Sequence, residues 1–225
     1  MGLTAREPKK YASVGADGTI RVKTSESDPI AVRRDYELRD GTKGTKWERV
    51  YNELSGMITD ISFQDGEFGK TLQVTVSDDE KVILTLNLAS NYAEDLMKKL
   101  PNIDYFKEVV FKPYSFEDKK KKLRKGISVY QNDVKIVSYF VDADGKPANG
   151  FPAPEEGKSY DSDDWKMYFI QARKFLQQFT EENIIDLVFA ANVERTARGE
   201  EPKEPKEHKE PTDDGKIDVD EIPFV

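Results

Sequence analysis

The stretch TLQVTVSDDEKVILTLNL, residues 71–88, decides the fold class of this chain. In residues 71–76 and again in residues 81–88, apolar side chains alternate with polar ones, as they do in a strand that buries one face. Ser77–Glu80, between the two runs, holds the small and acidic residues that favour a turn. The stretch therefore predicts a β-hairpin and a mainly β fold.

The segments on both sides of this hairpin extend the β pattern and add one helix. Trp47–Phe63 predicts a long strand before it, and residues 90–100 predict a short helix after it that ends at Pro101. Two more strands are expected, one over Lys107–Phe116 and one within Ile127–Val141. Three strands, a helix and two strands are the order expected of an OB-fold, a five-stranded, partly open barrel.

The composition divides the chain into five parts. We expect an N-terminal arm (1–43), the OB-fold nucleic-acid-binding domain (44–142), a linker (143–160), a helical extension (161–199) and an acidic tail (200–225). Proline, glutamate and lysine dominate the tail, which cannot bury enough apolar surface to offset the entropy of its chain. The tail is therefore predicted to be disordered.

The charge of the chain is unevenly distributed. The net charge is −8, and residues 200–225 hold ten acidic and four basic side chains, which puts −6 in the tail and leaves −2 for residues 1–199. The acidity of the whole chain therefore says little about the partners of its body.

The composition also excludes several kinds of chemistry. The chain has no cysteine, so disulfides, thiolate metal sites and cysteine nucleophiles are ruled out. Its single histidine, His208, lies in the predicted tail, and we find no nucleophile–base pair, metal cluster or phosphate-binding loop. We therefore expect a protein that is not an enzyme and needs no cofactor. No run approaches the length of a membrane span, which favours a soluble, cytoplasmic protein.

A basic cluster is the main candidate for binding nucleic acid. In the OB-fold interpretation it forms the loop between the fourth and fifth strands, which commonly borders the ligand groove. Lysines would hold phosphates, and nearby rings would stack on bases. The alternative is a solvated lysine loop flanked by core aromatics. The candidate residues are Lys119, Lys120, Lys121, Lys122, Arg124 and Lys125, with the aromatics Tyr114, Phe116 and Tyr130.

Further candidates lie outside this cluster. Two are in the first hairpin loop, where a phenylalanine beside two glycines is either exposed for stacking or folded back on the barrel. Two aromatics open the first strand, and at least one of them is expected to anchor the core. Two arginines belong to the arm. These residues are Phe68, Lys70, Trp47, Tyr51, Arg33 and Arg34. The aromatic stripe of the helical extension, by contrast, is expected to pack on the barrel or on a second subunit.

The chain ends with DVDEIPFV, residues 218–225, and this ending resembles the C-terminal tip of the bacterial single-stranded DNA-binding protein family, which includes phage relatives. The resemblance implies that Phe224 enters an apolar pocket on replication or repair proteins. The aromatic gives anchor area and the acids give steering. The implied partner-binding residues are Asp218, Asp220, Glu221, Ile222, Pro223 and Phe224.

Two features depart from that family. Val225 follows the phenylalanine that usually ends the chain, so the α-carboxylate moves one residue on. Two predicted helices also follow the predicted barrel. With these helices the chain resembles a divergent, phage-encoded member of the family.

The expected function is non-sequence-specific binding and protection of single-stranded DNA in replication, recombination or repair, in a bacterial cell or a phage-infected host. The alternatives are an RNA- or duplex-binding OB protein and a protein-interaction adaptor. The oligomeric state stays open.

Overall fold

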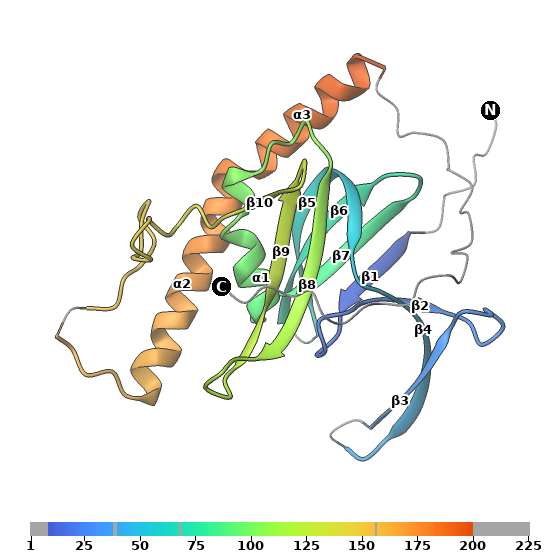
Figure 1. Ribbon diagram of the computed structural model, residues 1–225, viewed down its shortest axis with the longest axis horizontal. Helices are drawn as coiled ribbons and strands as arrows, with labels where there is room; N and C mark the ends of the chain where they lie inside the picture. Colours follow the sequence, from blue (N-terminus) through green and yellow to red (C-terminus); the bar gives the residue numbers. More distant parts are fainter. Residues whose placement is uncertain (1–8, 38–39, 68, 156, 200–225) are drawn as a thin grey trace, which may run out of the picture.

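The computed structural model describes residues 9–37, 40–67, 69–155 and 157–199 of the chain, and within them the fold is mainly β (Figure 1). One open sheet of ten strands runs in the order β10-β9-β8-β5-β6-β7-β1-β2-β4-β3. The strands are β1 (Lys10–Val14), β2 (Ile20–Thr24), β3 (Val32–Glu37), β4 (Lys43–Tyr51), β5 (Leu54–Gly66), β6 (Gly69–Ser77), β7 (Lys81–Asn87), β8 (Val109–Glu117), β9 (Leu123–Gln131) and β10 (Val134–Ile136). The helices are α1 (Asn91–Met97), the short 3-10 helix η1 (Leu100–Asn102), α2 (Ser162–Asn183) and α3 (Ile185–Ala197).

The centre of the sheet is a Greek key. β5, β6 and β7 follow one another as antiparallel hairpins, and β8 returns to pair with β5. The hairpin predicted over residues 71–88 is confirmed as β6 and β7, with Val74 opposite Leu84. The single long strand predicted over Trp47–Phe63 is wrong, because the chain leaves the sheet at Asn52 and Glu53 and forms two strands, β4 and β5.

The hydrophobic core lies between this Greek key and α1. The inward side chains of β6 and β7 alternate as their sequence predicted, and α1 contributes Leu96 and Ala93 to the same cluster. The side chain of Ser90 caps α1 by accepting a hydrogen bond of 3.2 Å from the backbone N–H of Ala93. The alternation and the cap together fix α1 against the sheet.

The five-stranded OB-fold barrel predicted from the element order is not confirmed, because its strands belong to one open sheet of ten. β7 pairs with β6 and β1, and β9 pairs with β8 and β10. Between β7 and β9 lies α1, and its Asp95 together with Lys99, which follows the helix, binds the backbone of Ile127 on β9. The fifth predicted strand corresponds to β9, which begins at Leu123, before the predicted range Ile127–Val141. The charged residues at the start of β9 obscured the strand pattern there.

The described residues of the predicted N-terminal arm belong to the sheet. β1 pairs in parallel with β7, and β2, β4 and β3 continue the sheet beyond it. Polar side chains occupy both faces of β3 and β4, so these two strands lack the alternation that reveals a half-buried strand, whereas β2 alternates and buries Ile20 and Val22. β2 and β4 pair across the predicted boundary between arm and barrel.

The C-terminal helices lie along one side of the sheet (Figure 1). Asp161 and Asp164 form a capping box at the start of α2. The two helices predicted after the barrel are confirmed as α2 and α3, which meet at Ile184, and α3 packs against β5. Arg195 of α3 is buried and donates to the backbone oxygen of Ile58 on β5 at 3.0 Å, which attaches α3 to the sheet.

The predicted linker of residues 143–160 contains Phe151, which packs on the buried Phe140 with ring centroids 5.7 Å apart. The predicted tail of residues 200–225 lies outside the described residues. No helix in the described part of the chain is long and apolar enough to cross a membrane.

Candidate nucleic-acid interface

The loop between β8 and β9 is a tight turn organised by Asp118. One carboxylate oxygen, Oδ1, accepts hydrogen bonds of 2.9 Å from the backbone N–H groups of Lys120 and Lys122. The other oxygen, Oδ2, accepts from Arg124 Nε at 2.9 Å. The hydrogen bond from the Lys122 backbone is the main cause that holds the pKa of Asp118 below its ordinary value. Lys121 completes the turn in the left-handed conformation, with φ 57°.

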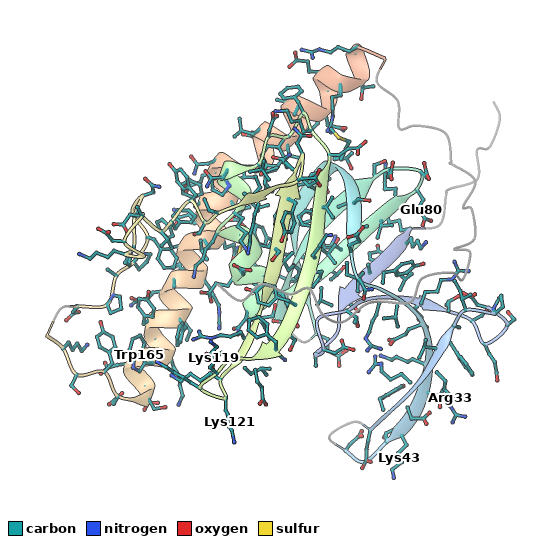
Figure 2. All side chains as sticks on the ribbon, in the orientation of Figure 1. Arg33, Lys43, Glu80, Lys119, Lys121 and Trp165 are labelled. Carbon is teal, nitrogen blue, oxygen red and sulfur yellow. The ribbon has the colours of Figure 1, made fainter. Side chains whose placement is uncertain are left out.

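The predicted DNA-binding lysines form the tip of this turn. Lys119–Lys122 are all exposed, and none of them forms an ion pair within the described residues. From Lys112 through Lys125 the hairpin holds seven basic and two acidic side chains. Figure 2 shows Lys119 and Lys121 at the end of the hairpin. We call Lys119–Lys122 the lysine tip. Within the part of the chain that the structure describes, the lysine tip therefore presents a phosphate with positive charge that is not held in ion pairs.

Two of the three predicted aromatics stand beside the tip. Phe116 is 55% exposed, and its ring centroid lies 5.7 Å from that of Tyr114 on the same face of β8. Burial raises the pKa of the Tyr114 hydroxyl, which is half-buried. Tyr130 lies at the other end of the hairpin, where Lys112 Nζ is 5.7 Å from its ring centroid. Phe116 and Tyr114 therefore lie beside the lysine tip, and Tyr130 does not.

A pocket of 380 Å³ lies between this hairpin and the helices, and we call it the hairpin pocket. Its lining includes Tyr114 and Lys125 from the hairpin and Phe169 and Arg173 from α2. Lys125, one of the predicted DNA-binding residues, thus lies at a pocket that the hairpin shares with α2.

A second pocket, of 290 Å³, lies between α2 and the start of β6, and its lining includes Lys70 and Arg173. Arg173 lines both pockets and therefore lies between two predicted DNA-binding residues, Lys125 in the first pocket and Lys70 in the second. Lys70 Nζ also lies 3.9 Å from a carboxylate oxygen of Asp65. Phe68, predicted as a stacking residue in the same loop, lies outside the described residues.

The predicted arginine Arg34 is held by a buried glutamate. Glu48 on β4 is 6% exposed, and its two carboxylate oxygens accept hydrogen bonds of 2.8 Å from Nε and Nη2 of Arg34. Arg21 Nη1 donates to the same carboxylate at 3.1 Å. The bond from Arg34 is the main cause that lowers the pKa of Glu48. Arg34 is thus partly neutralised and serves the structure of the β2–β4–β3 segment.

The remaining candidates of this segment lie on its opposite face. Arg33 stands in register with Trp47, so their side chains lie on one face of the sheet. Tyr51 follows Trp47 by four residues on β4 and lies on the same face. Arg33 is exposed and pairs with Asp35 at 3.1 Å. Trp47 is half-buried and Tyr51 is 36% exposed. The structure therefore separates Arg33 from its neighbour Arg34.

Two hairpins project from the same end of the sheet, the β8–β9 hairpin with the lysine tip and the β3–β4 hairpin (Figure 1). Arg33 and Lys43 mark the second in Figure 2. The turn between β1 and β2 lies between their bases, where Gly18 has φ 83° and packs on β8. A Cβ added at Gly18 would lie 2.6 Å from the backbone nitrogen of Ser115, so only glycine fits this approach.

The sequence alone did not select three of the basic residues that the structure places at these surfaces. Lys46 lies over the ring of Tyr36 at 4.8 Å from its centroid, on the face of Arg34. Arg21 shares the carboxylate of Glu48, as described above. Arg173 follows Phe169 by four residues on α2, a spacing that places a cation beside a ring on one face of a helix. That spacing is the one signal that could have identified Arg173.

Among the described residues, no group of three or more histidine, aspartate or glutamate side chains is arranged to hold a metal ion. The predicted partner-binding residues at 218–224 lie outside the described part of the chain.

Comparison of the chain with protein-family models, with curated proteins and with solved structures gave no match.

Proposed function

We propose that this protein binds single-stranded DNA without strong sequence preference, and that the observation carrying this function is the unpaired lysine tip beside exposed Phe116. Lysines attract the phosphate backbone, and an aromatic ring accepts any base on its face. Little sequence preference follows, because neither interaction reads the hydrogen-bonding edge of a base.

The arrangement of strands supports this proposal. We take β5–β9, with α1 between β7 and β8, as a divergent, open form of the OB-fold. In that fold the loops after the first and the fourth strands border the ligand site. Here these are the β5–β6 loop, next to Lys70, and the β8–β9 loop, which is the lysine tip.

The basic side chains suggest a path for the strand of DNA. It would run from the lysine tip past Lys125 and Arg173 to Lys70, along the two pockets that share Arg173. The β2–β4–β3 segment would contribute Arg33 as a further phosphate contact. Mechanistically this is binding and protection without a chemical step.

The tail would recruit partners. In this proposal Phe224 and the acids before it engage replication, recombination or repair proteins, as the resemblance of residues 218–225 to the bacterial and phage family implies. The protein would act in the cytoplasm of a bacterium or a phage-infected host.

The decisive experiment is a titration of the full chain with oligo(dT), followed by tryptophan fluorescence at several salt concentrations. We expect saturable binding that weakens with salt, with a slope of about −0.7 in log K against log salt for each phosphate contact. Competition with duplex DNA and with RNA of equal length then separates the related functions. Preference for RNA or duplex would replace single-stranded DNA as the ligand.

The absence of binding to any of the three nucleic acids at low salt would refute the proposal and favour a protein-interaction adaptor. Incubation of labelled single-stranded DNA with the protein and Mg²⁺ should leave the DNA intact, and shortened products would instead indicate a nuclease.

A further inference from the structure

The first turns of α2 carry a stack of aromatic rings at the surface. Tyr160 lies 4.8 Å from Trp165 with 37° between the ring planes, and Trp165 lies 5.9 Å from Phe169 with 28° between the planes. Trp165 is 39% exposed and Phe169 is 41% exposed. The stripe was expected to pack on the barrel or on a second subunit, and at these two positions more than a third of each residue stays exposed to solvent. Exposed aromatics that stack on one another are suited to accept another flat ring.

The last ring of this stack faces the hairpin pocket. Phe169 lines that pocket, opposite Tyr114 on β8. A volume of 380 Å³ falls in the range of about 300–1,000 Å³ typical of small-molecule sites. A planar ligand in this pocket would continue the stack beyond Phe169.

The charge around the pocket favours an anionic group on that ligand. Lys125 makes no ion pair within the described residues, and it lies three residues beyond the lysine tip. The two carboxylates that line the pocket are already paired. Glu94 binds Lys98 at 2.7 Å, and Asp95 binds Lys99 at 2.7 Å.

Arg173 brings a further hydrogen-bond donor to the pocket, and one of its N–H groups has no acceptor among the described residues. Arg173 Nε is buried and makes no hydrogen bond within the described residues, and its closest carboxylate oxygen, Glu94 Oε2, is 3.8 Å away. A small rotation of this guanidinium toward a phosphate oxygen would supply the missing acceptor.

We propose that the hairpin pocket is a nucleotide subsite of the DNA-binding surface, in which one base stacks on Phe169 and its phosphate is held by Lys125 and Arg173. This inference rests on the proposed function. It adds a stacking ring of α2 to the path proposed above and assigns Phe169 of the aromatic stripe a role in binding rather than in packing.

The test measures the affinity of full-length variants for fluorescently labelled oligo(dT) by anisotropy. We expect Phe169→Ala to weaken binding by about 5- to 100-fold, the range seen when a stacking ring is removed. Phe169→Tyr should retain the affinity because it keeps the ring. Lys125→Gln should weaken binding and lower the salt slope by about 0.7.

Met167→Ala is the matched control, because Met167 is an exposed residue of the same helix turn that does not line the pocket. It should bind DNA as the unmodified chain does. A second readout uses the fact that the chain has two tryptophans. In a Trp47→Phe chain the fluorescence of Trp165 alone should change when oligo(dT) binds.

The outcomes separate the two proposals. If oligo(dT) binds, and binding depends on Lys120 and Lys121 but not on Phe169 or Lys125, the subsite is refuted while the DNA-binding function stands. If the intact chain binds no nucleic acid, both fall. If Phe169→Ala changes the sedimentation of the free protein and leaves DNA binding unchanged, the stack is a contact between copies, and the subsite is refuted.

Discussion

The carboxylate of Asp95 on α1 accepts a hydrogen bond of 2.7 Å from the backbone N–H of Ile127 on β9. Lys99, one turn further along, donates to the carbonyl oxygen of the same residue at 2.6 Å and pairs with Asp95 at 2.7 Å. Both backbone groups of Ile127 are therefore satisfied by side chains of α1 and of the residues that follow it, where a closed barrel would use a neighbouring strand. This arrangement explains how the sheet stays open without an unsatisfied edge at this position.

The first prediction concerns the stability that this contact provides. Asp95→Ala should lower the free energy of unfolding by about 1–3 kcal/mol, because it leaves the N–H of Ile127 without its acceptor and Lys99 without its partner. The control is Asp163→Ala, which removes an equally short pair with Lys166 that is exposed on both sides. That change should cost no more than about 0.5 kcal/mol. Urea unfolding measures both, and equal losses would contradict the assignment.

The second prediction tests the lysine tip. The double variant Lys120→Gln/Lys121→Gln should bind oligo(dT) more weakly and lower the salt slope by about 1.4, which corresponds to two lost phosphate contacts. Lys107→Gln/Lys135→Gln removes the same charge at the other end of the β8–β9 hairpin. The slope of this control should stay unchanged, and a similar fall in both variants would show that only the total charge matters.

The third prediction concerns the acidic tail. Since residues 200–225 hold −6 of the net charge of −8, we expect them to compete with DNA for the basic surface. A chain that ends at Gly199 should bind oligo(dT) more tightly at low salt, and the difference should shrink as salt screens the charges. Unchanged affinity at every salt concentration would argue against competition. Phe224→Ala should leave DNA binding unaltered, because it keeps every acid of the tail.

A fourth prediction separates two adjacent arginines. Arg34→Ala should destabilise the protein by about 1–2 kcal/mol, because the buried carboxylate of Glu48 would keep only Arg21. Arg33→Ala removes an exposed pair with Asp35 and should change stability by less than about 0.5 kcal/mol. Thermal or urea unfolding of the two variants gives the comparison. A larger loss for Arg33→Ala would reverse the roles given to them.

The fifth prediction is a pH dependence. The pKa of Glu48 lies below its ordinary value of 4.5 in the folded chain, chiefly because Arg34 binds the carboxylate. Glu48 therefore adds stability above the pKa that it has in the unfolded chain, and this stability is lost as the pH falls through the folded value. The difference in unfolding free energy between the unmodified chain and Glu48→Gln should be largest near pH 7 and shrink below about pH 4.5. A constant difference across this range would contradict the role of the carboxylate.

The sequence predicted the parts of the fold in which burial differs between two faces. The alternate apolar residues from Leu72 to Leu86 all lie in the hydrophobic core, although Thr75, Ser77 and Ile83 between them are buried as well. The same reasoning did not predict that β2, β4 and β3 continue the sheet beyond β1. There the only fully buried side chain of β4 is Glu48, a charged residue whose burial depends on arginines from two other strands. No local pattern reveals such a contact.

The candidate site was predicted in part for a similar reason. The lysine tip is a local run of charge, and the structure presents it at the surface as expected. The hairpin pocket is assembled from β8, β9, α1 and α2, which the sequence cannot bring together without the tertiary fold. Phe169 and Arg173 therefore looked like packing and solvent-facing residues of an ordinary amphipathic helix.

The parallel pair of β1 and β7 also constrains the order in which the chain can fold. Lys10 stands in register with Val82, although more than seventy residues separate them in the sequence. A ribosome releases β1 and β2 long before β7 exists, so β1 pairs with β2 at once and its other edge waits for β7. The β1–β2–β4–β3 segment and the Greek key therefore each fold through local pairings, and the contact of long sequence separation that joins them at β1 and β7 slows the last step.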